Sequence, residues 1–304
     1  MSGLVSKAVL KTQVVSWLSY IGISVDTCEI EILSRSVGSE VIGVYTSTGT
    51  REHNFVIRRV LSADWLRREP NLVLREAKAL DLVESLPFST PKLISIDAEG
   101  RWFKSPAVLT EMLPGRPWLS GRKPGEKEIM GLADWLKLIH NARLIDEAVL
   151  CLPPYRPHHW PNALSMVPPK WSLCKDAWIT AARIARQCYP LEEQASVCLL
   201  HRDYRMENLL WNNQSPVAVI DWITACYGDP GADVGHCRWN LCHSWGQQAM
   251  ELFTVSYGCD NVHPVWDLLA AIGGLPDMKP ELTLSEINNL DAFITQAIDR
   301  CVGI

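Results

Sequence analysis

The chain has 304 residues, a mass of 34.2 kDa and a formal net charge of −5. Hydrophobic residues make up 47% of it and charged residues 21%, a composition that argues against long disordered tracts. No run of Lys or Arg stands out, so the charge argues against a nucleic-acid-binding protein. The length suffices for one large domain or for two lobes that each bury a core.

The N-terminus does not have the pattern of a secretion signal. Lys7 and Lys11 interrupt its apolar stretch, and no small-residue cleavage site follows. No window approaches the roughly 18 uninterrupted apolar residues that a membrane span needs. The ten cysteines are scattered singly without C-x-x-C pairs, which is typical of reduced thiols. We therefore expect a cytoplasmic protein that does not associate with membranes.

The first third of the chain reads as a β-rich lobe with a helix at its start and another inserted between its strands. Apolar residues at helical spacing predict a helix over 6–20. A second helix is expected from Asn71, as its N-cap, to Pro87. Short stretches rich in β-branched or aromatic residues, separated by Ser, Gly and Thr clusters, predict strands at 31–33, 41–45, 55–60, 92–96 and 107–110. Gly115 and Pro117 end this pattern, so the first lobe is placed at 1–113.

The remainder, 114–304, is predicted to be mainly helical. Helices are expected at 129–140, 175–187, 247–257, 263–272 and 285–301, with one more following Asp233. Three short apolar runs, at 197–200, 209–211 and 217–220, predict strands within this second lobe. A Pro- and Trp-rich connector occupies 153–171. The expected fold class is therefore α+β, with two lobes.

Polar residues with the chemistry of phosphoryl transfer gather around these three short strands. Asp203 and Asn208 share the loop after the first strand, and Asp221 lies at the end of the third. Phosphoryl transfer needs a carboxylate to orient the attacking hydroxyl and oxygen ligands that hold Mg²⁺ against the phosphates. Because Mg²⁺ keeps several waters, one Asn and one Asp suffice as its protein ligands.

The order H-x-D-x-x-x-x-N, followed by I-D-W and then by G-D-P-G-A-D-V from Gly228, resembles the signature of the aminoglycoside phosphotransferase and choline kinase family, relatives of protein kinases. The resemblance implies a protein-kinase-like two-lobe fold, with nucleotide binding in 1–113 and catalysis and substrate binding in 114–304. It further implies a Mg²⁺-dependent phosphotransferase that moves the γ-phosphate of ATP or GTP onto the hydroxyl of a small molecule.

The resemblance also implies roles for residues of this loop. Asp203 would be the catalytic base, and His201 would brace the loop. Asn208 and Asp221 would hold Mg²⁺. Arg205 occupies the place of the catalytic-loop Lys of protein kinases, so we expect it to assist the charge of the γ-phosphate. Asp233 is expected to cap the helix that follows it.

Matches in the first lobe concern the nucleotide. Arg58, in F-V-I-R, stands where kinases carry the Lys of V-A-I-K, and Glu76 stands on the following helix. The resemblance implies a cation on the α- and β-phosphates held by the helix carboxylate, although the planar fork of Arg is not geometrically equivalent to Lys. Ser39 lies in the first hairpin, where the family covers the phosphates. The backbone near Glu111 and Leu113 resembles the hinge that meets the purine.

Two other functions remain open at this stage. The sequence H-R-D and Arg205 suggest a protein kinase, but only about seven residues separate Asp221 from Asp229, which leaves no room for an activation loop. A non-catalytic nucleotide-binding pseudokinase is suggested by Arg58 and by the lack of a G-x-G-x-x-G loop. The acceptor, the choice between ATP and GTP and the oligomeric state are left open.

Two further groups of residues have alternative interpretations. Acidic residues late in the chain would suit a polyamine acceptor if they faced the substrate, and otherwise would be solvated surface: Asp260, Asp267 and Asp277. The sequence His236-Cys237 followed by Cys242-His243 could suggest a metal cluster, but its spacing favours a packed helix.

Overall fold

The structure is a computed structural model that describes residues 6–36, 38–119, 121–142, 151–157, 167–189, 197–258, 262–275 and 281–303. The chain forms two compact units. The N-terminal unit comprises Met1–Pro114 together with Trp222–Thr224, and the C-terminal unit comprises Gly115–Asp221 and Ala225–Ile304. The chain thus enters the N-terminal unit again directly after Asp221.

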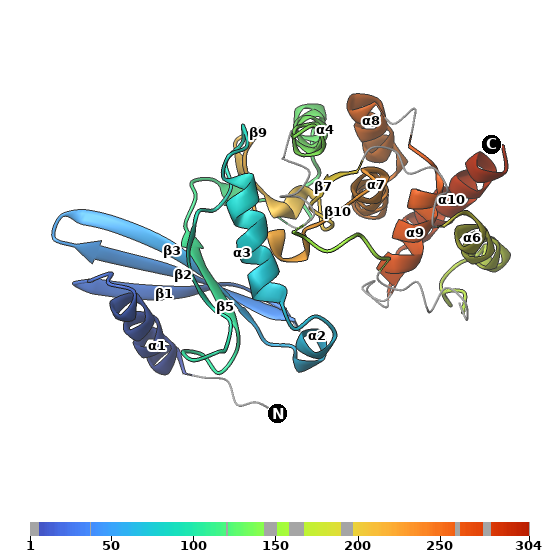
Figure 1. The fold of residues 1–304 in the computed structure, drawn as a ribbon. Coiled ribbons are helices and arrows are strands. Elements are labelled where there is room, and N and C mark those ends of the chain that lie inside the picture. Colours follow the sequence, from blue (N-terminus) through green and yellow to red (C-terminus); the bar gives the residue numbers. More distant parts are fainter. Residues whose placement is uncertain are drawn as a thin grey trace. The chain divides into compact units, whose positions relative to one another are not determined.

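The N-terminal unit is built on a five-stranded antiparallel sheet with the order β1-β2-β3-β5-β4 (Figure 1). Each strand predicted for the first lobe overlaps one of these strands, so this part of the prediction is confirmed. Their bounds are β1 (Thr27–Arg35), β2 (Ser39–Thr48), β3 (Arg51–Val60), β4 (Leu93–Asp97) and β5 (Ala107–Glu111).

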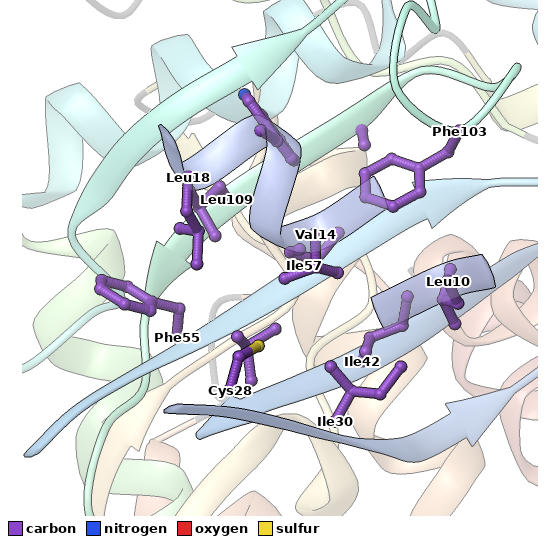
Figure 2. Close-up of a cluster of buried hydrophobic side chains, with 13 residues drawn as sticks. Leu10, Val14, Leu18, Cys28, Ile30, Ile42, Phe55, Ile57, Phe103 and Leu109 are labelled. Atoms are coloured by element: carbon purple, nitrogen blue, oxygen red, sulfur yellow. The ribbon is translucent and has the colours of Figure 1, made fainter. Parts of the chain in front are cut away.

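Helix α1 (Lys7–Tyr20) covers one face of this sheet. Figure 2 shows Leu10, Val14 and Leu18 of α1 directed toward Ile42 and Ile57 of the strands. Because side chains alternate along a strand, Arg58, next to Ile57, points to the opposite face. There it meets helix α3 (Leu72–Val83) through Glu76. Because neighbouring side chains of β3 point to opposite faces of the sheet, one face forms the core with α1 and the other forms the ion pair with α3.

The helices of this unit differ from the sequence prediction at two places. A short helix, α2 (Ala63–Arg68), was not predicted, because its six residues bury nothing and carry no apolar periodicity. The predicted helix 71–87 begins as expected at Leu72 but ends at Val83. Its end is earlier because Pro87 disfavours helical backbone at the residue before it.

The C-terminal unit consists mainly of helices, as predicted, and carries two small sheets. Its described residues form the following helices of eight or more residues: α4 (Glu126–His140), α6 (Lys175–Cys188), α7 (Gly231–Trp245), α8 (Gln247–Tyr257), α9 (Val265–Gly274) and α10 (Leu284–Val302). One sheet has the order β6-β8-β9, with β6 (Arg116–Pro117), β8 (Leu209–Asn212) and β9 (Ser215–Val219). The other pairs β7 (Cys198–Leu200) with β10 (Cys226–Gly228).

Helix α7 packs closely against α9 because two of its residues have no side chain. Gly231 and Gly235 lie one turn apart and both face Trp266. A β-carbon placed on Gly235 would lie 2.5 Å from the carbonyl oxygen of Trp266. This close approach fixes the position of α7 against α9. Asp233 of α7 in turn holds the loop after β7. Within the described residues, no helix is both long and apolar enough to cross a membrane.

Candidate active site

The loop that carries the predicted catalytic residues runs from His201 to Arg205, between β7 and the short 3₁₀ helix η2 (Met206–Asn208). Its backbone is held by the buried carboxylate of Asp233 on α7. Asp233 Oδ2 accepts a hydrogen bond from the His201 N–H at 2.8 Å, and Oδ1 accepts one from the Arg202 N–H at 2.6 Å.

The expectation that Asp233 caps its own helix is therefore wrong. Asp233 is the third residue of α7, and its carboxylate extends to the loop after β7 instead. At the start of α7, Asp229 Oδ1 accepts a hydrogen bond from the Gly231 N–H at 2.7 Å. The sequence could not separate these two acids, because both precede or open the same helix.

His140 of α4 completes the environment of Asp233. Its Nε2 lies 3.3 Å from Asp233 Oδ2, and its Nδ1 lies 2.7 Å from the hydroxyl of Tyr257. Burial alone would raise the pKa of Asp233, but the hydrogen bond and charge of His140 hold that pKa below its usual value. His140 was not found from the sequence, since it stands 93 residues before Asp233 in an ordinary helical pattern.

His201 links the loop to the strand that precedes Asp221. Its buried ring donates a hydrogen bond through Nε2 to the carbonyl oxygen of Ile220, at 2.8 Å. The carbonyl can only accept, so the proton must be on Nε2. The loop is thus attached to α7 through its backbone and to the end of β9 through a side chain.

Three side chains surround the carboxylate of Asp203. Asn208 Nδ2 donates to Asp203 Oδ2 at 2.9 Å and to the backbone carbonyl of Asp203 at 2.7 Å. His236 Nε2 lies 3.1 Å from Oδ1, and Arg205 Nε lies 3.3 Å from the same oxygen. The Asp203 side chain keeps 31% of its surface exposed, so a substrate can still reach it.

The charge state of Asp203 follows from these partners. Burial alone would raise its pKa, but the hydrogen bond from His236 and the charge of Arg205 outweigh it and hold the pKa of Asp203 well below its usual value. The carboxylate is therefore ionised throughout the neutral range. An ionised, fixed and accessible carboxylate can accept a hydrogen bond from a hydroxyl and align it.

Asn208 and Asp221 are brought to the same edge by pairing of β8 with β9. Leu209 pairs with Val219, and the Ile220 N–H donates to the Asn208 carbonyl oxygen at 2.9 Å. Asp221 follows directly, with φ of +70°, a left-handed backbone that is costly for a residue other than Gly. Arg202, and Asn213 in the turn between β8 and β9, adopt a left-handed backbone as well.

The residues predicted to bind nucleotide lie in the N-terminal unit. Arg58 Nε lies 3.2 Å from Glu76 Oε1, and both side chains are largely buried. Ser39 begins β2, and its N–H donates to the Ser36 hydroxyl at 3.0 Å. Glu111 ends β5 and is exposed, and Leu113 follows it. The structure thus joins Arg58 to Glu76, whereas Ser39, Glu111 and Leu113 occupy the ends of strands or the residues after them.

The late acidic residues do not form a polyamine site in the described part of the chain. Asp267 is buried and ion-paired with Arg238, at 2.9 Å, and with Arg300, at 3.0 Å. It therefore stabilises the contact between α7, α9 and α10. Asp260 and Asp277 lie outside the described residues.

A pocket of the C-terminal unit combines aromatic rings with one acid. It is lined by Pro154, Tyr155, Tyr189, Tyr227, Gly228, Asp229 and Trp266. Arg202 contacts its wall, because its guanidinium lies 5.7 Å from the centre of the Tyr155 ring and donates to the Arg156 carbonyl oxygen at 2.8 Å. Arg202 thus has a structural role here. Burial raises the pKa of Asp229 above its usual value.

Comparison with known proteins agrees with this geometry. Residues 35–272 match the model of a family described as the phosphotransferase enzyme family, APH. The match spans well over half of the chain. The chain belongs to this phosphotransferase family. None of the curated proteins compared with it by sequence matches.

Solved structures of similar fold include two phosphotransferases and a kinase. Macrolide 2′-phosphotransferase MphH from Brachybacterium faecium is 15% identical, with a TM-score of 0.60, and 93% of this chain and 97% of that chain are covered. A thermostable mutant of aminoglycoside phosphotransferase APH(4)-Ia is 16% identical, with a TM-score of 0.59 and coverage of 96% and 97%. Amicoumacin kinase hAmiN, crystallised with AMP-PNP, Ca²⁺ and Ami, is 12% identical, with a TM-score of 0.60 and coverage of 96% and 95%.

The expected fold is thereby confirmed. The phosphotransferase has the α+β, protein-kinase-like architecture, with a small antiparallel sheet in its N-terminal unit and a mainly helical C-terminal unit. Its family membership supports a kinase-type enzyme that acts on small molecules. The family resemblance seen in H-x-D-x-x-x-x-N and I-D-W identified the correct family.

Proposed function

We propose that this phosphotransferase transfers the γ-phosphate of ATP or GTP to a hydroxyl group of a small molecule, with Asp203 as the residue that receives the hydroxyl. The observation that carries the proposal is the fixation of the Asp203 carboxylate. Asn208 holds Oδ2 at 2.9 Å and His236 lies 3.1 Å from Oδ1, while 31% of the side chain stays exposed. A carboxylate held in this way orients the attacking oxygen without reorganisation at the moment of reaction.

The low pKa of Asp203 suits it to orientation. A carboxylate whose pKa lies far below its usual value is a weak proton acceptor. Asp203 therefore accepts a hydrogen bond from the hydroxyl and takes the proton only late in the transfer. Phosphoryl transfer passes through a loose transition state in which the attacking hydroxyl has little need to lose its proton early. Arg205, which remains 41% exposed, supplies positive charge beside Asp203 for the transferred phosphoryl group.

The donor set of Asn208 and Asp221 fits Mg²⁺. Asn208 uses both hydrogens of its amide nitrogen on Asp203, so the amide oxygen lies on the other side of the group and is available as a ligand. Asp221 would supply a carboxylate oxygen, and together they form the small oxygen set that Mg²⁺ takes from proteins. When bound, Mg²⁺ would neutralise charge on the nucleotide phosphates.

The N-terminal unit is proposed to bind the nucleotide, and residues 114–304 to carry catalysis and the acceptor. Arg58, held by Glu76 at 3.2 Å, would contact the α- and β-phosphates. Ser39 would cover the phosphates from the first hairpin. The backbone near Glu111 and Leu113 would meet the purine. Structures of fold relatives that contain AMP-PNP or ATP support nucleotide use by this chain.

A small-molecule acceptor is favoured over a protein acceptor. Between Asp221 and Asp229 the chain forms η3 (Trp222–Thr224) and β10, which leave no length for an activation loop. The fold relatives include a complex with streptomycin and one with hygromycin B. These support a small polyhydroxylated acceptor here, and the choice among such molecules is the object of the experiment.

The deciding experiment is ADP or GDP release with Mg·ATP and Mg·GTP against a panel of aminoglycosides, macrolides, amino alcohols and sugars. We expect acceptor-dependent turnover that Asp203→Ala reduces by at least about 1,000-fold, while nucleotide binding persists. Turnover retained by Asp203→Ala would refute the assigned role. Nucleotide binding without turnover for any acceptor would instead favour a pseudokinase.

A further inference from the structure

His236 faces the proposed catalytic carboxylate, although its sequence pattern gave it no role beyond that of a packed helix. It lies on α7 three residues after Asp233, so both side chains project from the same face of the helix. Asp233 holds the backbone of the loop at His201 and Arg202. His236 reaches the next residue of that loop, with its Nε2 at 3.1 Å from Asp203 Oδ1.

The partners of Asp203 differ in how firmly they are held. Asn208 belongs to η2 and fixes Oδ2 and the Asp203 backbone together. Among the described residues, Oδ1 has two partners: His236, and Arg205, whose longer side chain is 41% exposed and whose Nε lies at 3.3 Å. Ordering an Arg costs more side-chain entropy than ordering a His. His236 also lies on α7, which packs closely against α9 where Gly235 meets the backbone of Trp266. His236 is therefore the more rigid restraint on Oδ1.

We propose that His236 is a positioning residue of the phosphotransferase, which fixes the orientation of the Asp203 carboxylate through Oδ1. This inference rests on the proposed function of Asp203. With Asn208 on one oxygen and His236 on the other, the carboxyl plane has one orientation. Without His236, Arg205 is the partner of Oδ1 that remains in the described part of the chain, and the carboxyl plane can rotate, so the acceptor hydroxyl loses its alignment. Nucleotide binding does not depend on this restraint.

The kinetic test compares His236→Ala, His236→Gln and a matched control, His243→Ala. His243 stands seven residues further along the same helix and stacks on Trp239, so its loss changes α7 without touching Asp203. With the best acceptor of the panel, we expect His236→Ala to lower kcat by about 10- to 100-fold, the cost of misaligning a reacting group. KM for Mg·ATP should change less than about twofold. His236→Gln should recover part of kcat because its amide N–H can reach Oδ1, and His243→Ala should keep the parental kcat.

A spectroscopic measurement tests the contact without any turnover. The ring-nitrogen resonances of His236 and His243 are compared, in ¹⁵N-histidine-labelled protein, between the parent chain and Asp203→Ala. We expect the His236 resonance to move and that of His243 to stay. An unmoved His236 resonance, or a His236→Ala enzyme with unchanged kcat, would overturn the inference. If no acceptor turns over but the resonance moves, the proposed function fails while the contact stands, so the two failures are distinguishable.

Discussion

The carboxylate of Asp233 accepts a hydrogen bond from the backbone N–H of Arg202, at 2.6 Å. This bond holds Arg202 in a left-handed backbone conformation, with φ of +72°. A residue with a β-carbon adopts that conformation at a cost of about 1–2 kcal/mol, whereas Gly adopts it freely. The loop after β7 is thus bent at a residue that is intrinsically unsuited to the bend, and the hydrogen bond to the buried Asp233 compensates.

This relationship predicts the outcome of two substitutions at position 202. Arg202→Ala and Arg202→Gly both lose the contacts of the guanidinium with Arg156 and Tyr155. Only the Gly variant also removes the β-carbon. We therefore expect Arg202→Gly to be more stable than Arg202→Ala by about 1 kcal/mol, as measured by urea denaturation. Equal stability of the two variants would show that the left-handed conformation carries no cost here.

The opposite pKa shifts of two acids near the start of α7 predict opposite pH dependences of stability. The pKa of Asp233 is lowered in the folded protein. Its contribution to the free energy of unfolding is therefore fully present above its unfolded-state pKa of about 3.9, and it is lost as the pH falls through its lower folded-state pKa. The stability difference between the parent chain and Asp233→Asn should therefore shrink on acidification below about pH 4.

Burial raises the pKa of Asp229, so its contribution to stability depends on pH in the opposite direction. Its folded form binds a proton more tightly than the unfolded form, and its contribution falls as the pH rises from about 3.9 through the folded value. The difference between the parent chain and Asp229→Asn should shrink as the pH rises. Urea denaturation of the three proteins between about pH 3 and 7 measures both trends, and parallel trends would contradict the assignment.

The close contact between α7 and α9 predicts a strong effect of one methyl group. At Gly235 a β-carbon would lie 2.5 Å from the Trp266 carbonyl oxygen, a backbone atom that cannot move without shifting α9. We expect Gly235→Ala to lower the free energy of unfolding by about 1–3 kcal/mol. Gly273→Ala is the matched control, since Gly273 lies within α9 with nothing within 4 Å of its β-position. It should be neutral or stabilising by up to about 1 kcal/mol.

The Arg58–Glu76 pair predicts a specific loss of nucleotide affinity. Both side chains are largely buried, so removing Glu76 takes away the carboxylate that lies 3.2 Å from the guanidinium and helps to orient it. We expect Glu76→Ala to weaken Mg·ATP binding by about 10- to 100-fold, as measured by calorimetry. Lys11→Ala removes an exposed ion pair with Glu29 in the same unit and should leave the affinity unchanged. An unchanged affinity of Glu76→Ala would exclude the pair from the nucleotide site.

The sequence by itself determined the family and the elements of the fold. The β-branched and aromatic residues of Phe55–Val60 predicted a strand, because strand propensity is a local property of the chain. The motif from His201 to Asn208, with Asp221 at the end of a further strand, identified the family because its residue types and their spacing are visible in the local sequence. Short elements such as α2 escaped prediction, since six residues without a buried face have no periodicity to detect.

Only the tertiary structure decided how the acids and histidines are used. Asp233 and Asp229 look alike beside one helix start, yet one holds the loop backbone and the other the first turn. Asp267, which could have faced a cationic substrate, is enclosed by two arginines. His140 contacts Asp233 across 93 residues of sequence, and His236 contacts Asp203 of the loop across 33. Hydrogen bonds between distant segments depend on how helices pack, and packing depends on surfaces that local sequence patterns do not encode.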